Sequence, residues 1–295
     1  MKKKILIIGA GPAGLTCGYQ ISKNKKFEST IVEISKNVGG MARSIKLFDR
    51  IVDIGPHRFF SNDTRVNKLW LEVIGNEYKM VNRLTRIYYK NKFFNYPLKP
   101  FNALFNLGII TSILCVLSYF KYLFFPIKDT SNFKNWITNR FGYKLYSIFF
   151  KSYTEKLWGV HPEKLSSEFA KQRIKDFSLG EAIKQLFLKK NNHKTLVDQF
   201  AYPISGNGYV YEKMKDLYID KGGEILFSTK ITSIISQKNT YEVMFEDLPT
   251  QKFDYVISSM PIDNFLNLFK NYTKKIPGLK FRNTILVYSN IKSEN

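Results

Sequence analysis

A glycine-rich turn between an apolar run and a helix-forming run constrains this chain more than any other feature. The run from Lys4 to Ile8 is nearly continuous in apolar residues, as a buried parallel strand is. The turn that follows reads Gly-Ala-Gly-Pro-Ala-Gly, and its predicted ligand contacts are Gly9, Gly11, Ala13 and Gly14. Glycines here permit a tight turn, a close approach of backbone to a pyrophosphate, and close packing of helix on strand. The expected helix from Leu15 to Ser22 offers free N–H groups and a helix dipole to an anion.

A second strand and an acidic residue complete the unit. Residues 29–34 are rich in β-branched side chains, and Glu33 follows Gly14 by 19 residues. A carboxylate at the end of the second strand accepts hydrogen bonds from a ribose. Because strand, turn, helix, second strand and acid are all in place, the sequence predicts an α/β fold with a Rossmann-like dinucleotide-binding domain.

The stretch Val-Gly-Gly-Met-Ala-Arg-Ser after Glu33 distinguishes between dinucleotides. Gly39 and Gly40 allow backbone to approach a ligand, and Arg43 offers a charge-assisted fork to phosphate. With this stretch the chain resembles the FAD-binding flavoenzymes of glutathione-reductase-like fold. It is most similar to the branch that holds amine oxidases, protoporphyrinogen oxidases, phytoene desaturases and UDP-galactopyranose mutases. The resemblance implies FAD as the cofactor.

A third motif, Asp-Ile-Gly-Pro-His, begins at Asp53. Gly55 and Pro56 are expected to hold backbone against a flat ring system, and His57 to lie near flavin or substrate. In the mutases a similar Gly-Pro-His stretch lies by the isoalloxazine, whereas the oxidases more often carry Asp-x-Gly. Since Asp53 and Gly55 match that pattern too, this motif fits both branches.

The segment from Tyr146 to Arg173 resembles the helical substrate domain of the mutases. It contains a Tyr-Thr-x-Lys-x-Trp run and a downstream arginine. The resemblance implies that Tyr153 stacks on a uracil, Trp158 approaches the substrate and Arg173 holds a diphosphate. Aromatic platforms suit bases and guanidinium groups suit diphosphates. An aromatic helical core with a surface arginine is the alternative.

The resemblance also implies a domain division. We expect a Rossmann-like FAD domain with a helical and mixed-sheet substrate domain inserted into it. The expected segments are 1–82 (FAD domain), 83–205 (substrate domain, with a hairpin and a helical insertion), 206–265 (return to the FAD domain) and 266–295 (second substrate segment). The backbone at Ile231 is expected to meet the adenine. Family members are longer than this chain, so we expect a C-terminal truncation.

Local signals predict several further elements. They are a helix at 64–74 capped by Asp63 or Thr64, a hairpin over 83–96, and strands at 224–227, 231–235, 241–245, 253–258 and 285–288. The apolar run from Leu107 to Phe125 contains Lys121 and is followed by proline. We expect a helix packed on the protein, with peripheral membrane contact through 107–125 as an open alternative.

Composition bears on partners and location. The chain has 46 Lys and Arg against 24 Asp and Glu, a net charge of +22. The lysines are spread along the chain, and no zinc-finger, RNP-like or basic heptad pattern occurs, so no nucleic-acid partner is predicted. The three histidines show no metal-ligand spacing, and the two cysteines suggest a reducing, cytoplasmic setting. Composition does not determine the oligomeric state.

Three functions are compatible with the sequence. The first is a mutase-like enzyme in which reduced flavin acts as the nucleophile on a nucleotide sugar. The second is an FAD-dependent oxidoreductase of the amine-oxidase or protoporphyrinogen-oxidase type, which takes a hydride from a hydrophobic reductant. The third is a non-catalytic fragment. The first is favoured narrowly, because the substrate-domain segment is specific to the mutases.

Overall fold

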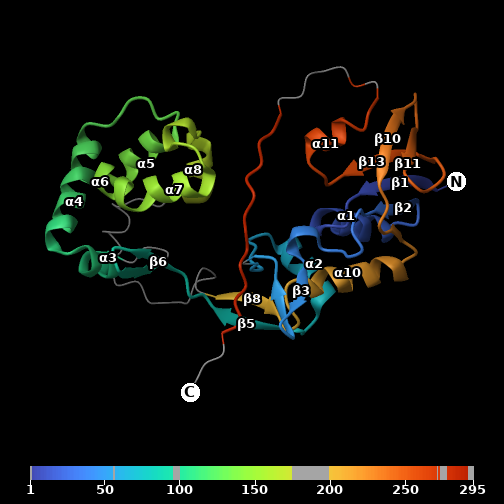
Figure 1. Cartoon of the computed structure of the whole chain (residues 1–295), viewed down its shortest axis with the longest axis horizontal. Helices are drawn as coiled ribbons and strands as arrows, with labels where there is room; N and C mark the ends of the chain where they lie inside the picture. The colour runs from blue at the N-terminus through green and yellow to red at the C-terminus, as the bar shows by residue number, and fades with distance from the viewer. Residues whose placement is uncertain are drawn as a thin grey trace. The chain divides into compact units, whose positions relative to one another are not determined.

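The computed structural model describes residues 2–55, 57–95, 100–174, 199–270, 272 and 278–291. The chain divides into two compact units (Figure 1). Unit 1 comprises Met1–Asn82 and Leu196–Asn295, and unit 2 comprises Arg83–Thr195. The assignment of these units to FAD and to substrate stays a prediction.

A four-stranded parallel sheet forms the centre of unit 1. Its order is β13-β1-β2-β9, with bounds Tyr255–Ser258, Lys3–Ile8, Phe27–Val32 and Glu224–Leu226. Strand β1 therefore has a parallel neighbour on each side, and its last four residues are buried. This burial on both faces explains why the strand is nearly continuous in apolar residues.

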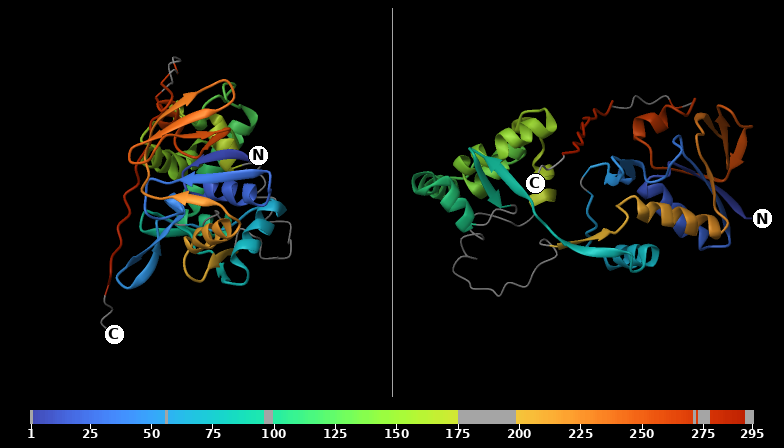
Figure 2. Two further views of the ribbon diagram at one scale, coloured as in Figure 1. Left: turned by 90° about the vertical axis from the view of Figure 1, so that its right-hand side faces the viewer. Right: turned by 60° about the horizontal axis from the view of Figure 1, so that its bottom comes forward.

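Alternate residues of β1 serve two different cores. Ile5 and Ile7 pack with α1 (Pro12–Ser22), α2 (Thr64–Ile74) and α10 (Tyr209–Asp220). Leu6 and Ile8 pack with residues of a second sheet, whose strand order is β10-β11-β12. The bounds of those strands are Ile231–Ser236, Tyr241–Phe245 and Gln251–Phe253. The parallel sheet thus lies between helices and an antiparallel sheet, as the views in Figure 2 show.

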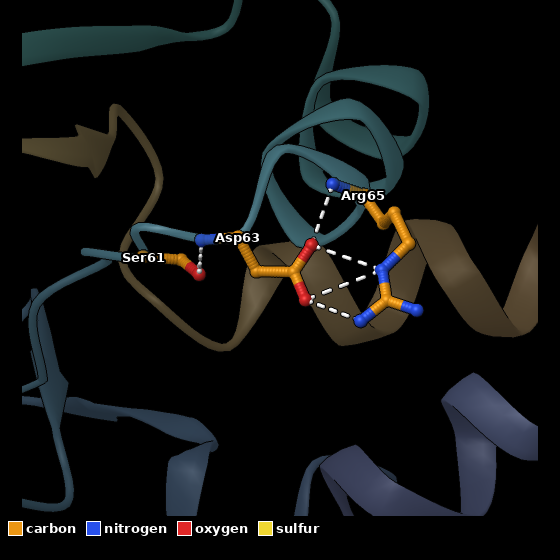
Figure 3. Close-up of polar contacts among 3 residues, drawn as sticks. All are labelled: Ser61, Asp63 and Arg65. Atoms are coloured by element: carbon orange, nitrogen blue, oxygen red, sulfur yellow. Dashed lines mark hydrogen bonds and ion pairs between the residues drawn. The ribbon is translucent and has the colours of Figure 1, made fainter.

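Helix α2 begins and ends where the sequence predicts. The Asp63 carboxylate accepts a hydrogen bond from the backbone N–H of Arg65 at 2.9 Å, and its oxygens pair with the Arg65 guanidinium at 2.7 Å (Figure 3). The Asp63 N–H in turn donates to Ser61 Oγ at 3.0 Å. The cap satisfies N–H groups that lack a partner within the helix, which fixes the first residue.

The strand predicted at 253–258 is instead two strands in two sheets. Asp254 separates β12 from β13, and its carboxylate accepts from Lys4 N and from Lys3 Nζ, both at 2.7 Å. Its own N–H donates to the Lys4 carbonyl at 2.8 Å. The chain therefore passes from the antiparallel sheet to the parallel sheet at this residue.

The prediction of a strand at 285–288 is wrong. Residues 278–291 are irregular, and Ile285 and Val287 are exposed. A strand needs a neighbour for its backbone hydrogen bonds, and none of the described strands pairs with this segment. Its hydrogen bonds include Leu279 N, which donates to Asp263 at 2.6 Å, and Tyr288 OH, which donates to the Asp53 carbonyl at 2.5 Å.

Four remaining strands and two short helices complete unit 1. Strands β3 (Ser44–Leu47) and β4 (Arg50–Asp53) form a hairpin, and β5 (Tyr78–Asn82) pairs with β8 (Gln199–Pro203). The short helices are η1 (Gly40–Ala42) and α11 (Ile262–Leu266). Because β8 pairs with β5 in unit 1, the helical unit ends before the predicted boundary at 205.

Unit 2 is a hairpin followed by helices. The hairpin joins β6 (Arg86–Tyr89) to β7 (Lys92–Asn95), within the predicted range. The helices are α3 (Pro100–Leu107), α4 (Ile109–Phe124), α5 (Phe133–Phe141), α6 (Tyr143–Leu145), the π-helical turn η2 (Tyr146–Lys151), α7 (Ser152–Trp158), η3 (Pro162–Lys164) and α8 (Ser167–Ile174). Their core is largely aromatic and contains Phe94, Phe133, Phe141, Tyr146 and Phe149.

Candidate dinucleotide site

The turn between β1 and α1 requires glycine at two positions for steric reasons. Gly9 has φ +97°, in the left-handed region. A Cβ at Gly14 would lie 1.8 Å from the Gly9 carbonyl oxygen. Helix α1 has no side-chain cap at Gly11, so its first N–H groups are left for a ligand at this turn.

Glu33 lies directly after β2 and is held by backbone groups. Its carboxylate accepts from Ala10 N at 2.7 Å and from Ser35 N at 2.9 Å. These bonds fix the carboxylate beside the Gly9–Gly14 turn. A third link in the same region is the Thr229 N–H, which donates to the Glu33 carbonyl at 3.1 Å. Strand β10 begins at Ile231, two residues after the Thr229 that contacts Glu33.

The second glycine pair packs against the first turn. Gly39 N donates to the Ala10 carbonyl at 2.9 Å, and both Gly39 and Gly40 have positive φ. A Cβ at Gly40 would lie 3.2 Å from the Gly11 Cα. The structure therefore brings two sequence-predicted glycine motifs into direct backbone contact at one end of the parallel sheet.

Arg43 has a property that suits an anionic ligand. Its Nε is buried, and it has no hydrogen-bond partner among the described residues. A buried guanidinium donor without a partner is costly, and a phosphate oxygen would satisfy it. With the uncapped N-terminus of α1 and the glycine turns, this atom indicates that the local residues fit a dinucleotide diphosphate.

A hollow of about 440 Å³ lies beside Arg43 in unit 1. Its wall includes Asn37, Ser44, Lys46, Tyr209 and Glu212. These polar side chains surround the arginine on the side of α10. The hollow therefore has a mixed lining of polar and apolar side chains next to the predicted phosphate contact.

Asp53 organises the region behind the glycine turns, a role that the motif analysis missed. One carboxylate oxygen accepts from Ser44 Oγ at 2.6 Å and from Asn207 N at 3.0 Å, and the other accepts from Tyr202 OH at 2.8 Å. Gly208 N donates to Ser44 Oγ at 2.8 Å. Two sequence signals could have pointed to this network: the Asp-x-Gly pattern at Asp53 and the Gly-Asn-Gly at 206–208. Neither signal shows that the two segments are in contact, because they lie about 150 residues apart.

We predict an alkaline loss of stability at this network. Burial and the hydrogen bond to Asp53 raise the pKa of Tyr202 to about 12, from an unfolded value near 10. Because the folded state favours the neutral Tyr202 hydroxyl, this group contributes its full stabilisation below about pH 10. The contribution is lost as the pH rises from about 10 towards about 12. The unfolding free energy of the wild type, minus that of Tyr202→Phe, should fall by about 1–2 kcal/mol between pH 9 and pH 11.5 in urea titrations. A difference that is constant across this range would contradict the coupling.

The third motif is held close to η1. His57 Nε2 lies 2.8 Å from the Ile54 carbonyl and 2.9 Å from the Met41 carbonyl. Since carbonyls only accept, Nε2 carries the proton, and in the neutral ring Nδ1 is the acceptor nitrogen. Gly55 has φ +88°, and Pro56 lies outside the described residues. His57 thus ties the end of β4 to η1, whether or not it contacts a ligand.

The predicted substrate residues lie in unit 2. The Tyr153 side chain on α7 is 64% exposed. Trp158, at the end of α7, packs edge-on against Phe169 of α8 with centroids 4.8 Å apart. Arg173 lies in α8, and its side chain is outside the described residues. The structure therefore brings Trp158 to α8 and leaves Tyr153 accessible, while their substrate roles stay predictions.

The sequence is similar to a Rossmann-like family model and to two coproporphyrinogen III oxidases. Residues 7–73 match the family model of the NAD(P)-binding Rossmann-like domain. The coproporphyrinogen III oxidase of Staphylococcus aureus is 23% identical over 333 residues, which cover 100% of this chain and 69% of that protein. The coproporphyrinogen III oxidase of Bacillus subtilis is 33% identical over 89 residues, covering 28% of this chain and 19% of that protein.

Solved structures share the fold. A crystal structure of reduced UDP-galactopyranose mutase superposes with a TM-score of 0.77 at 23% identity, covering 92% of this chain and 58% of that one. An Exiguobacterium protein assigned as a protoporphyrinogen oxidase gives a TM-score of 0.67 at 17% identity, covering 91% and 61%. The chain thus spans less than two thirds of each of these solved chains.

The predicted fold class and the predicted resemblance are confirmed by these matches. The matched proteins are named as a mutase and as oxidases, which agrees with the predicted enzyme class. The matches also agree with FAD as the predicted cofactor. At these identities the structural similarity establishes the fold. Reaction and substrate are therefore taken up as proposals.

Proposed function

We propose that this chain binds FAD and forms the FAD-binding part of a flavoenzyme that acts on a small molecule. The observation that carries the proposal is the contact between the two glycine motifs beside Glu33. Helix α1 has no side-chain cap there, and Arg43, three residues after Gly40, has a buried Nε without a partner among the described residues. This arrangement is suited to a diphosphate with a ribose on one side.

Each part of the cradle has a proposed role. The backbone of Gly9, Gly11, Ala13 and Gly14 holds the diphosphate, with Gly39, Gly40 and Arg43 beside it. Glu33 accepts from the ribose hydroxyls, and the backbone at Ile231 meets the adenine. The sequence motif Gly55-Pro56-His57 is proposed to contact the flavin ring. When bound, FAD supplies a nucleophile in its reduced state or a hydride acceptor in its oxidised state.

A mutase-like reaction on a nucleotide sugar is the first candidate. It is supported by the similarity to UDP-galactopyranose mutase and by the Tyr-Thr-x-Lys-x-Trp run of α7. In this proposal Tyr153 and Trp158 contact base and sugar, and Arg173 binds the diphosphate of the substrate. These residues bind and orient the substrate and exclude water around the reacting sugar.

An oxidation of a hydrophobic reductant is the second candidate. It is supported by the similarity over the full chain to the Staphylococcus aureus coproporphyrinogen III oxidase and by the apolar run at 107–125. Peripheral membrane contact through that run belongs to the same proposal. A cytoplasmic location, with the protein at the membrane surface, is compatible with both candidates.

The two candidates differ in net redox change. With FAD-loaded protein, we expect UDP or UDP-galactose to perturb the spectrum of the dithionite-reduced flavin if the mutase candidate is right. If the oxidase candidate is right, we instead expect the protein to consume coproporphyrinogen in the presence of oxygen, with measurable oxygen uptake. A flavin-loaded chain that responds to neither compound would contradict the mutase reaction on UDP-galactose and the oxidation of coproporphyrinogen.

A further inference from the structure

Helices α3 and α4 carry an extended apolar surface on the outside of unit 2. Ile110 is 78% exposed, Leu117 is 59% exposed and Phe105 is 82% exposed. We call the whole set the α3–α4 apolar face; its exposed members are Phe105, Ile109, Ile110, Ile113, Leu114, Leu117, Phe120, Leu123, Phe124 and Phe125. Apolar patches of this extent usually mark an interaction surface.

The opposite side of α4 is fixed to the unit. Ser112 and Cys115 are buried, and the helix packs on α5 and α6. The backbone of α4 approaches that of Gly142 closely, since a Cβ at Gly142 would lie 2.6 Å from Tyr119 N. Ser118 Oγ accepts from Lys144 N at 3.1 Å. The helix therefore has a buried side and an outer side on which the exposed residues are apolar except for Lys121.

The sequence segment that contains this face has charged residues of one sign. Between Glu77 and Asp129 the sequence contains no Asp or Glu. It contains eight basic residues there, namely Lys79, Arg83, Arg86, Lys90, Lys92, Lys99, Lys121 and Lys128. Lys121 and Lys128 are exposed on and just after α4, and Lys92 Nζ donates to the Asn106 carbonyl at the end of α3 at 2.9 Å. Basic side chains thus flank the apolar helices.

We propose that the α3–α4 apolar face lies on a lipid bilayer rich in anionic lipids. An apolar helix face with flanking lysines is the pattern of an interfacial helix, whose apolar side chains enter the acyl boundary while lysines meet anionic headgroups. At 16 residues α4 is too short to cross the hydrocarbon core, and none of the described helices has the length and hydrophobicity for a span. A hollow of about 700 Å³ lined by α3 and α4 gives an acyl chain a place to insert.

This inference extends the membrane contact in the proposed function, but it rests on the surface of unit 2 and not on FAD. The test is cosedimentation of the full chain with vesicles of phosphatidylcholine alone or mixed with phosphatidylglycerol. We expect binding to the anionic vesicles that weakens as salt rises. The Ile110→Glu/Leu117→Glu variant should lower the partition coefficient at least about tenfold.

A matched control separates the face from net charge. Val66→Glu/Ile219→Glu changes the net charge equally, at exposed apolar positions on α2 and α10 of unit 1. It should bind vesicles within about twofold of the wild type if the face carries the binding. Lys121→Glu/Lys128→Glu, which leaves the apolar side chains in place, should weaken binding to anionic vesicles only.

Several outcomes would overturn the inference. One is a wild-type chain that stays in the supernatant with anionic vesicles, and another is unchanged binding of Ile110→Glu/Leu117→Glu. A third is a dimer, seen by sedimentation velocity, that persists when vesicles are added and is absent in the Ile110→Glu/Leu117→Glu variant. The α3–α4 apolar face would then be covered by a second copy of the chain and not by lipid. Flavin absorbance of the same samples reports FAD binding separately, so either proposal can fail alone.

Discussion

Gly14→Ala is expected to abolish FAD binding and to destabilise unit 1. The added Cβ would lie 1.8 Å from the Gly9 carbonyl oxygen and 3.0 Å from the Gly9 carbonyl carbon. Both are backbone atoms of the turn that is proposed to hold the diphosphate, so relief requires the turn to move. We expect a loss of FAD affinity of at least about 100-fold, because the backbone N–H groups lose their positions. The free energy of unfolding should fall by about 3 kcal/mol.

Gly18→Ala is the matched control on the same helix. Its Cβ would meet the end of the Ile31 side chain at 2.8 Å and the Tyr218 ring at 3.2 Å, and Ile31 can shift. Alanine also favours helix over glycine by about 1 kcal/mol. FAD titrations followed by flavin fluorescence, with urea unfolding of the apoprotein, compare the two variants. If Gly14→Ala bound FAD as tightly as Gly18→Ala, the proposed cradle would be wrong.

Asp53→Ala is the second large effect. The substitution leaves Ser44 Oγ, Tyr202 OH and Asn207 N without their acceptor. Each partly buried donor that loses its partner costs about 1–3 kcal/mol, so we expect urea unfolding to show a loss of about 3 kcal/mol or more. Because Ser44 follows Arg43 directly, FAD affinity should fall as well.

The control for this network is Asp216→Ala on α10. The Asp216 side chain is 66% exposed and pairs only with a neighbouring surface lysine among the contacts described. Exposed ion pairs contribute about 0–1 kcal/mol, so its unfolding curve should nearly coincide with that of the wild type. Equal destabilisation by Asp53→Ala and Asp216→Ala would show that the Asp53 hydrogen bonds do not hold the region together.

Features set by local signals were predictable from the sequence. Helix α2 has a capping aspartate, an amphipathic pattern and a terminal glycine, and it spans the predicted residues. The turn at Gly9–Gly14 lies where strand and helix signals meet, because a glycine requirement there is steric and local. The position of Glu33 follows from the length of β2 and the loop after it.

Features that depend on distant contacts were not predictable. The pattern at 253–258 predicts one strand, although Asp254 binds Lys3 and Lys4 and divides the segment between two sheets. The run Ile-Leu-Val-Tyr at 285–288 predicts a strand, but a strand also needs a partner, and pairing is not encoded in one segment. The Asp53 network joins residues about 150 positions apart. Single-segment patterns cannot show which distant donors meet one carboxylate.

The most direct test of the central claim is retention of cofactor by the purified chain. The chain is incubated with FAD or with NADPH, passed over a desalting column, and scanned in the visible and near-ultraviolet range. The account predicts that flavin absorbance elutes with the wild-type protein and is lost in Gly14→Ala. A folded wild-type chain that elutes without flavin, or that retains NADPH in its place, would contradict it.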